Sequence, residues 1–288
     1  MLNALTIDVE DYFHANAMDG VVAPHAWDDL PARVEVNTRR VLDVLDEHRA
    51  QATFFVLGWV AERWPRLVDD IAARGHEVAC HGYAHRLVYQ LGPVRFRADV
   101  ERAKRVLEDR LGVAVEGFRA ASYSIVPSTL WALDVLIEQG FQYDASVFPI
   151  HHDLYGFPEF SRFAVRVRRP AGEIVEIPGS TVRFLGRNWP VAGGGYFRLL
   201  PLAMTCGASR HLNARAGRPA IVYLHPWEFD ADQPRLPAGI RTRLRQYTNL
   251  RRTEPRARQL LRRFRFAPIR RALTFQDLPV VAAAAPCA

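Results

Sequence analysis

The strongest constraint on the fold is a repeated alternation between short β-rich runs and segments with helical periodicity. The β-rich runs lie at residues 5–9, 52–57, 77–80, 115–118, 141–147 and 220–224. Most are followed by a segment whose apolar residues recur every three or four positions, at residues 33–49, 60–74, 94–111 and 128–139. A strand followed by a crossover helix leads to a parallel neighbour, so this order predicts an α/β fold with a parallel sheet.

Two segments depart from the alternation. Residues 163–177 alternate with period two about a central turn, which predicts a β-hairpin inserted between the strand–helix units. Three glycines at residues 193–195 indicate a flexible loop or a place of close backbone approach. Because the 288 residues contain no repeat and no low-complexity linker, we expect one domain, with a catalytic barrel in residues 1–230 and a helical extension in residues 231–288.

Positive charge is concentrated near the end of the chain. The formal net charge is +7, and residues 235–271 hold thirteen arginines with a single acidic residue, Glu254. Nucleic-acid binding is one interpretation of such a segment. Leucine, tyrosine and phenylalanine residues are interleaved with the arginines at largely helical spacing, which favours packing against the barrel or peripheral contact with an anionic membrane.

The chain contains no apolar run near the ~18 residues that a membrane-spanning helix needs, and its first residues lack the pattern of a secretory signal. Its three scattered cysteines, Cys80, Cys206 and Cys287, suggest reduced thiols rather than a disulfide framework. We therefore expect a cytoplasmic protein, with peripheral attachment to the inner membrane as an extension of that expectation.

Residues able to do catalytic chemistry follow the β-rich runs. They are Asp8, Glu10 and Asp11 after the first run, His81 and His85 after the third, Arg119 after the fourth and His225 after the last. The carboxyl ends of parallel barrel strands open on one face, so residues more than 200 positions apart are expected to meet there. Taken singly, each of these residues is more often a strand-end cap, a core residue or a surface residue than a catalytic one. Their joint placement at the ends of several strands favours an active site.

Two histidines and a carboxylate suit a divalent metal ion. His81 and His85 stand at positions i and i+4, which one helical turn places on the same side. Glu10 shares its strand face with Asp8, whereas Asp11 joins them only if the chain turns after Val9. Such a ligand set leaves coordination positions open, as hydrolytic zinc sites do. We expect zinc, with cobalt or nickel as alternatives.

Four ordered motifs resemble those of the polysaccharide deacetylases, the family 4 carbohydrate esterases. They are Leu-Thr-Ile-Asp-Val-Glu-Asp at 5–11, Gly-His-Glu-Val-Ala-Cys-His-Gly-Tyr-Ala-His at 75–85, Phe-Arg-Ala-Ala-Ser-Tyr-Ser at 118–124 and Tyr-Leu-His-Pro-Trp at 223–227. Residues 8–14, 193–198 and the arginine-rich tail resemble, more narrowly, the subgroup associated with exosortase (PEP-CTERM) exopolysaccharide loci.

The resemblance implies a distorted (β/α) barrel, often seven-stranded, and metal-dependent removal of acetyl groups from N-acetylated sugars of an exopolysaccharide intermediate. By position, Asp8 is similar to the general base, His81 and His85 to the metal-binding histidines, Arg119 to the residue that holds the base and His225 to the general acid. The same metal barrel acting on a small amide or an O-acetyl ester, and a non-catalytic glycan- or nucleic-acid-binding protein, are the alternatives.

The sequence departs from the family pattern at three places. The usual adjacent Asp pair is Asp-Val-Glu-Asp here, so the acidic ligand is Glu10 or Asp11, and strand phase favours Glu10. Gly82 replaces a common Ser or Thr whose hydroxyl would brace the histidine loop. Ala121 replaces a common Pro, which leaves either Ser122 or Tyr123 for the oxyanion position.

The remaining expectations concern substrate contacts and the acid that supports His225. Aromatic rings stack on sugar faces, so Tyr123, Tyr196, Phe197 and Trp227 are candidates for sugar contacts, and Ser122 is expected to bind substrate through the oxyanion position. A general acid needs a neighbouring carboxylate to raise its pKa, and Asp144 and Glu176 are the two candidates for His225.

Overall fold

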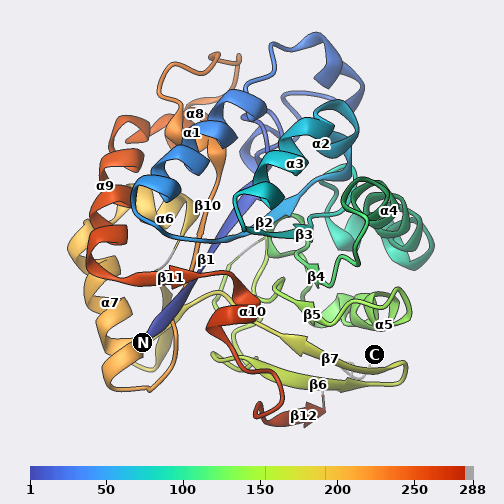
Figure 1. Ribbon diagram of the computed structural model, residues 1–288, viewed down its shortest axis with the longest axis vertical. Coiled ribbons are helices and arrows are strands. Elements are labelled where there is room, and N and C mark those ends of the chain that lie inside the picture. Colours follow the sequence, from blue (N-terminus) through green and yellow to red (C-terminus); the bar gives the residue numbers. More distant parts are fainter. Residues whose placement is uncertain (153, 192, 283–288) are drawn as a thin grey trace.

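A mostly parallel sheet forms the centre of the molecule (Figure 1). The computed structural model describes residues 1–152, 154–191 and 193–282. Within them, seven strands run parallel in the order β10-β1-β2-β3-β4-β5-β7. Their bounds are Leu2–Val9 (β1), Thr53–Val56 (β2), Glu77–Cys80 (β3), Gly117–Phe118 (β4), Tyr143–Asp144 (β5), Gly172–Glu176 (β7) and Ile221–Leu224 (β10). The predicted α/β class is confirmed, although the described strand pairs form an open path rather than a closed ring.

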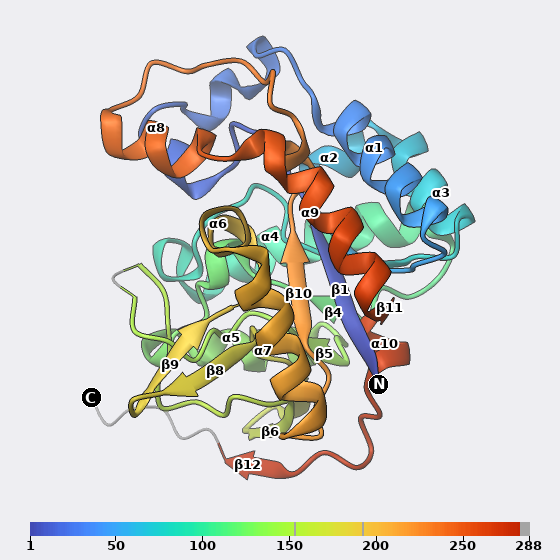
Figure 2. The ribbon, with the colours of Figure 1, turned by 90° about the vertical axis from the view of Figure 1, so that its left-hand side faces the viewer.

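Helices surround the curved sheet on its outside (Figure 2). They are α1 (Val34–Glu47), α2 (Gly58–Arg63), α3 (Pro65–Ala73), α4 (Val88–Leu111), α5 (Trp131–Glu138), α6 (Gly194–Leu199), α7 (Leu202–Ala214), α8 (Ile240–Tyr247), α9 (Leu250–Arg263) and α10 (Ile269–Ala272). None of the helices among the described residues is both long enough and apolar enough to cross a bilayer. Cys80 and Cys206 are buried free thiols, and Cys287 lies outside the described residues.

Proline and glycine explain where the observed helices differ from the predicted ones. The helix predicted at residues 60–74 is divided into α2 and α3 because Pro65 starts a new helix at its first position. Helix α4 begins at Val88, earlier than predicted. It is kinked at Gly92, which has a φ of 70° and stands directly before Pro93.

The predicted hairpin at residues 163–177 is present as β6 (Val165–Arg169) paired antiparallel with β7. It is more than an insertion, since β7 also pairs parallel with β5 and so extends the main sheet. A second hairpin, β8 (Thr181–Phe184) with β9 (Arg187–Pro190), forms a separate two-stranded sheet that the sequence pattern did not reveal. The three glycines at residues 193–195 were predicted to form either a flexible loop or a close backbone approach. The backbone does approach the Tyr223 ring closely, because a Cβ at Gly193 would overlap that ring.

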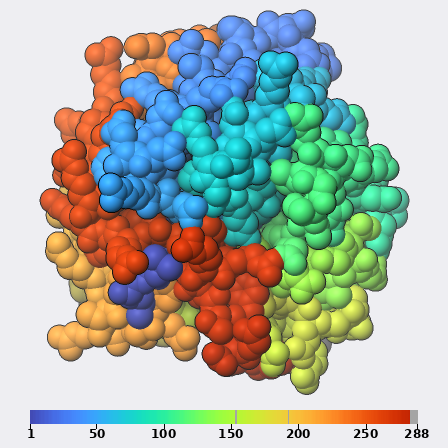
Figure 3. All heavy atoms as spheres, viewed as in Figure 1, coloured from blue at the N-terminus to red at the C-terminus, as the bar shows by residue number. Residues whose placement is uncertain are grey.

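The segment after Pro237 is largely helical, as predicted, but it also contributes two strands. Strand β11 (Arg265–Ala267) pairs with the first residues of β1, and β12 (Val280–Ala282) pairs with β6. Figure 3 shows this segment, in red, beside the dark blue start of the chain. Helix α9 buries Leu250, Ala257 and Leu260 against the core, so its apolar face is already used in packing.

Candidate active site

The predicted catalytic residues meet at the carboxyl ends of the parallel strands. Asp8 and Glu10 stand at the end of β1, His81 follows β3, Arg119 follows β4 and His225 follows β10. Strands β10, β1, β2, β3 and β4 are sequential neighbours in the sheet, so their ends share one edge. These largely buried strands therefore hold the side chains in fixed relative positions.

Glu10, His81 and His85 form a compact group of ligand atoms. The Glu10 Oε1 atom lies 3.1 Å from His81 Nε2 and 3.0 Å from His85 Nε2. One ligand atom from each of the three residues lies within 4.8 Å of the others, and all three side chains are buried. Burial opposes ionisation of Glu10, but the positive charges of His85 and His225 hold the pKa of Glu10 well below its usual range.

The hydrogen bond on the far side of His81 shows that this group fits a cation. His81 Nδ1 lies 2.7 Å from the Arg119 carbonyl oxygen, so Nδ1–H is the donor. In the neutral ring, Nε2 then directs a lone pair at the Glu10 carboxylate, and two acceptors that face each other need a positive charge between them. A divalent ion held by two imidazoles and one carboxylate meets that need.

Asp99 of α4 fixes the loop that carries the histidines. Its carboxylate accepts hydrogen bonds from the backbone N–H groups of Tyr83 and Ala84, at 2.7 and 3.3 Å. A Cβ at Gly82 would lie 2.9 Å from the same carboxylate, and Gly82 has a φ of 73°. The Asp99 carboxylate thus braces the histidine loop in place of the missing Ser or Thr hydroxyl. A side chain at position 82 would push this carboxylate away. No motif in the sequence pointed to Asp99.

Asp11 is not part of the metal-ligand group. Its carboxylate accepts backbone hydrogen bonds from Tyr12, Arg33 and Val34, at 2.8, 2.6 and 2.9 Å. These contacts tie the end of β1 to the first turn of α1, whose free N–H groups favour an anionic partner. The strand-phase argument for Glu10 over Asp11 therefore agrees with the geometry.

Asp8 is paired with the buried guanidinium of Arg119. Arg119 Nη1 donates to Asp8 Oδ1 and to Thr6 Oγ1, each at 2.7 Å, and its Nε donates to the Ala145 carbonyl at 3.1 Å. Two partners on β1 and a third just after β5 leave Arg119 little freedom. The second carboxylate oxygen, Asp8 Oδ2, faces His225 Nε2 at 3.8 Å.

The acid that supports His225 is Glu228, and the two predicted candidates were wrong. His225 Nδ1 lies 2.9 Å from Glu228 Oε2, and Glu228 Oε1 accepts a 2.7 Å hydrogen bond from Arg198 Nε. Burial alone lowers the pKa of His225, but the charges of Glu228 and Glu10 outweigh it and raise that pKa to about 9. His225 is therefore protonated at neutral pH, with Nε2–H directed at the site.

Asp144 and Glu176 are instead a buried pair of acids near Arg119. The Asp144 carboxylate accepts a hydrogen bond from the Ser146 hydroxyl, and Glu176 accepts one from the Val147 N–H at 2.9 Å. Burial raises the pKa of Asp144 to about 6 and that of Glu176 well above its usual range. Their adjacency on β5 and β7 was not visible in the sequence, because it required β7 to pair with β5.

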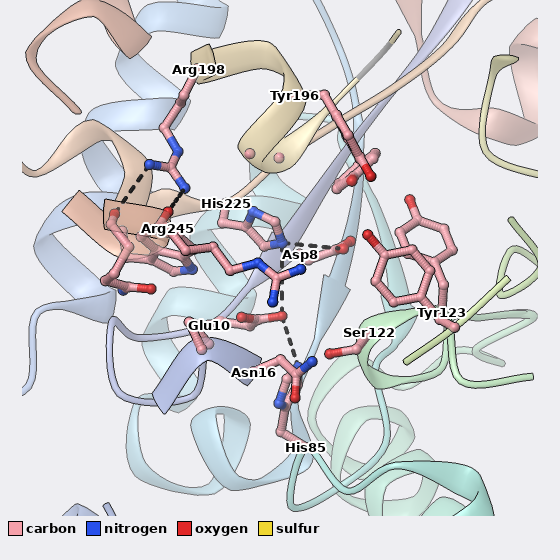
Figure 4. A pocket seen from close by; sticks show the side chains of 18 of the residues that line it. Asp8, Glu10, Asn16, His85, Ser122, Tyr123, Tyr196, Arg198, His225 and Arg245 are labelled. Carbon is pink, nitrogen blue, oxygen red and sulfur yellow. Dashed lines mark hydrogen bonds and ion pairs between the residues drawn. The ribbon is translucent and has the colours of Figure 1, made fainter. Parts of the chain in front are cut away.

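A cavity of about 260 Å³ opens above these groups (Figure 4). The four expected substrate-binding residues Ser122, Tyr123, Tyr196 and Trp227 all line it. Further lining residues that the sequence did not suggest are Asn16, Tyr155, Arg198 and Arg245. The walls are thus aromatic while the floor carries carboxylates and histidines, a combination suited to a sugar ring with a reactive substituent.

The fold and site define a class of α/β protein in which two histidines and one carboxylate, a group that could hold a metal ion, are flanked by an Asp–Arg and a His–Glu pair. Residues 19–142 match the family model for polysaccharide deacetylase, and residues 145–274 match a domain of unknown function (DUF3473). Residues 19–142 are thus similar in sequence to polysaccharide deacetylases, and the relatives described below show the same similarity.

Among the relatives, a chitooligosaccharide deacetylase of Sinorhizobium fredii is 39% identical over 130 residues, which cover 44% of this chain and 57% of the relative. A peptidoglycan-N-acetylglucosamine deacetylase of Bacillus cereus is 32% identical over 98 residues, covering 34% and 36%. The chain thus spans less than two thirds of either relative. A Mycobacterium smegmatis crystal structure assigned to the polysaccharide deacetylases is 26% identical, with a TM-score of 0.57 over 85% of this chain and 81% of that one.

Proposed function

We propose that the protein is a metal-dependent hydrolase that removes N-acetyl groups from an amino-sugar polysaccharide or oligosaccharide. The observation that carries the proposal is the convergence of Glu10, His81 and His85 beside both Asp8 and His225. The names of the relatives, which deacetylate chitooligosaccharide and peptidoglycan, support an N-acetylated glycan as substrate.

In the proposed mechanism, the chain's own groups move two protons. When a divalent cation is held by Glu10, His81 and His85, it supplies Lewis acidity toward water and the acetyl carbonyl. Asp8 takes the proton of the attacking water on Oδ2, while Arg119 holds Oδ1. His225 then gives the proton on Nε2 to the departing amine nitrogen, and Glu228 keeps Nδ1–H oriented. Without that second proton transfer, the amine is a poor leaving group and the reaction reverses.

We further propose that the four expected residues Ser122, Tyr123, Tyr196 and Trp227 contact the sugar, and that the substrate is an exopolysaccharide intermediate deacetylated in the cytoplasm. Resemblance of residues 8–14 and 193–198 to the exosortase-associated subgroup supports the pathway. The two buried free thiols support the compartment. The proposal treats residues 1–288 as one functional unit with the barrel in residues 1–230.

Acetate release tests this proposal directly. Purified protein is expected to release acetate from N-acetylglucosamine oligomers, to lose that activity on chelation and to regain it with zinc, cobalt or nickel, because the ligand set suits these ions. Full activity after complete chelation would refute the metal assignment. Parallel assays with small amides and O-acetyl esters separate the alternative substrates, and DNA binding without acetate release would favour a nucleic-acid-binding protein.

We also propose peripheral contact with an anionic membrane, restricted to α8 and the β8–β9 hairpin. Helix α8 leaves Ile240 77% and Leu244 61% exposed, and Arg241 and Arg243 lie on the same short helix. The hairpin exposes Phe184, Leu185 and Trp189 at 62%, 83% and 52%. Figure 2 shows α8 and the hairpin toward the same side of the molecule. Large exposed apolar side chains next to arginines are typical of surfaces that bind lipid.

Vesicle sedimentation tests the membrane contact. The protein is expected to bind vesicles containing phosphatidylglycerol and to dissociate at high salt, since each arginine near an anionic surface contributes about 1 kcal/mol. The double variant Ile240→Ser/Leu244→Ser should bind more weakly yet keep its activity on soluble oligosaccharides. Equal binding to neutral phosphatidylcholine vesicles, or none to either, would contradict this contact.

A further inference from the structure

The peptide unit between Arg119 and Ala120 is held at both of its ends. Its carbonyl oxygen, on Arg119, accepts the Nδ1–H of His81 at 2.7 Å, and its N–H, on Ala120, donates to Ser146 Oγ at 2.7 Å. Because a peptide unit is planar, a rotation that weakened one of these hydrogen bonds would weaken the other as well. The orientation of the His81 ring is therefore tied to Ser146, which follows β5.

The hydroxyl of Ser146 is in turn held by Asp144. It donates to Asp144 Oδ1, and both side chains are fully buried. All bonds in this hydrogen-bond series have the same direction: His81 donates to the carbonyl of the peptide unit, the N–H of that unit donates to Ser146, and Ser146 donates to Asp144. Hydrogen bonds aligned in this way polarise one another, so the carboxylate at the end strengthens the bond at the start.

Glu176 is the neutral partner of Asp144. The two residues are neighbours in the pairing of β5 with β7, and their side chains form a hydrogen bond. The oxygens that have no other partner among the described residues are Asp144 Oδ2 and Glu176 Oε2. Two carboxyl groups can share a hydrogen bond only when one of them carries a proton. Burial and the charge of Asp144 raise the pKa of Glu176 well above its usual range, so the proton is on Glu176, and Asp144 remains the anion.

The hydrogen-bond series crosses four neighbouring strands at the edge that carries the site. Figure 1 shows these strands in succession, with Glu176 on β7, Asp144 on β5, Arg119 after β4 and His81 after β3. Asp144, Ser146 and Glu176 do not line the cavity. Any effect of these three side chains on the site therefore passes through the groups that they hold.

We propose that Asp144, Ser146 and Glu176 are positioning residues for His81, and that together they raise the affinity of the protein for a divalent cation. This inference rests on the proposed function, because it takes the proposed metal-ligand group as given. A histidine whose Nδ1–H is held by a carboxylate is a better metal ligand at Nε2. Here a peptide unit and a serine hydroxyl carry the same effect over a longer path.

Zinc affinity, measured on the metal-free protein by competition with a chelator, tests the inference without turnover. Ser146→Ala leaves the Ala120 N–H without its acceptor. We expect this variant to bind zinc about 10-fold more weakly, at the lower end of the loss of about 10- to 100-fold that is typical when a group holding a metal-ligating histidine is replaced. Glu176→Gln should bind zinc as wild-type protein does, because its amide can still donate to Asp144 and accept the Val147 N–H.

Ser180→Ala is the matched control. Ser180 is also buried, and its hydroxyl oxygen also accepts a backbone N–H, that of Ile221 at 2.8 Å. Within the described parts of the chain, no hydrogen bond links Ser180 to the proposed metal ligands. Both serine variants should lower the melting temperature, whereas only Ser146→Ala should lower zinc affinity. Equal affinity losses in the two serine variants, or an unchanged affinity in Ser146→Ala, overturn the inference. A loss in Glu176→Gln as large as that in Ser146→Ala also overturns it.

Acetate release separates this inference from the proposed function. At limiting zinc, Ser146→Ala should lose activity about 10-fold, and saturating zinc should bring kcat to within about threefold of wild type, because Asp8 and His225 are unchanged. If wild-type protein releases no acetate while the expected order of zinc affinities holds, the deacetylase proposal fails and the positioning role stands. If acetate is released and Ser146→Ala binds zinc like wild type, the inference fails alone. If wild-type protein binds no zinc, cobalt or nickel, the inference fails together with the metal assignment.

Discussion

Asp8→Asn is expected to lower kcat for acetate release by about 10²- to 10⁴-fold, the contribution typical of a positioned general base. The amide has nearly the shape of the carboxylate, and its oxygen can still accept the 2.7 Å hydrogen bond from Arg119. Unlike the carboxylate, however, the side-chain amide of Asn cannot take a proton from water. The loss should therefore appear in kcat with little change in KM, measured by steady-state acetate release with saturating metal.

Asp11→Asn provides the control for this variant. It removes the neighbouring carboxylate, whose partners are three backbone N–H groups rather than the site. The expected result is a lower melting temperature, because the links to the first turn of α1 are weakened, with kcat preserved. A drop in kcat for Asp11→Asn as large as that for Asp8→Asn would contradict the roles assigned to the two residues.

Glu228→Gln is expected to affect both stability and pH dependence. It leaves the buried Arg198 guanidinium without its ion-pair partner, and breaking a buried pair on one side typically costs about 3–5 kcal/mol in the free energy of unfolding. It also removes the charge that raises the pKa of His225 to about 9. Because the general acid must be protonated, activity falls as the pH rises through that pKa, so the alkaline limb should move to lower pH.

The double variant Arg198→Met/Glu228→Gln separates the two effects. Replacing both members removes the unpaired buried charge, so part of the stability lost in the single variant should return, although the carbonyls of Arg245, Gln246 and Thr248 lose their donor. His225 still lacks its carboxylate, so the shifted alkaline limb should remain. Melting temperature and the pH profile of kcat check the two parts. An alkaline limb that returns to the wild-type position together with stability would show that Glu228 acts only through folding.

The order of elements was predictable because burial on both faces gives parallel strands an unbroken apolar sequence. Residues 53–56, for example, are Thr-Phe-Phe-Val and are fully buried in β2. Helices α6 and α7 and the β8–β9 hairpin were missed. Helix α6 begins within three glycines, and the hairpin shows no alternation because both of its faces are largely exposed. Local pattern fails where tertiary contacts, not periodicity, determine the structure.

The candidate site was predictable to the extent that one strand or one turn determines it. Alternation along β1 placed Asp8 and Glu10 on one face. The spacing of His81 and His85 indicated a shared cation, although residues 81–85 form a loop rather than the expected helical turn. Glu228 had a local signal that went unused: it stands three residues after His225 with Pro226 between, the pattern of a capped turn. Arg198 and Arg245 had none, since their roles depend on where separate helices pack.

The pairing of β11 with β1 has a consequence for synthesis of the protein. The strand that covers Leu2–Ala4, Arg265–Ala267, is translated more than 250 residues after them. For nearly the whole of translation, the nascent chain carries an unprotected strand edge next to the residues that become Asp8 and Glu10 of the site. Pairing of this uncovered edge with another chain is therefore an expected route to aggregation when the protein is produced in a foreign host.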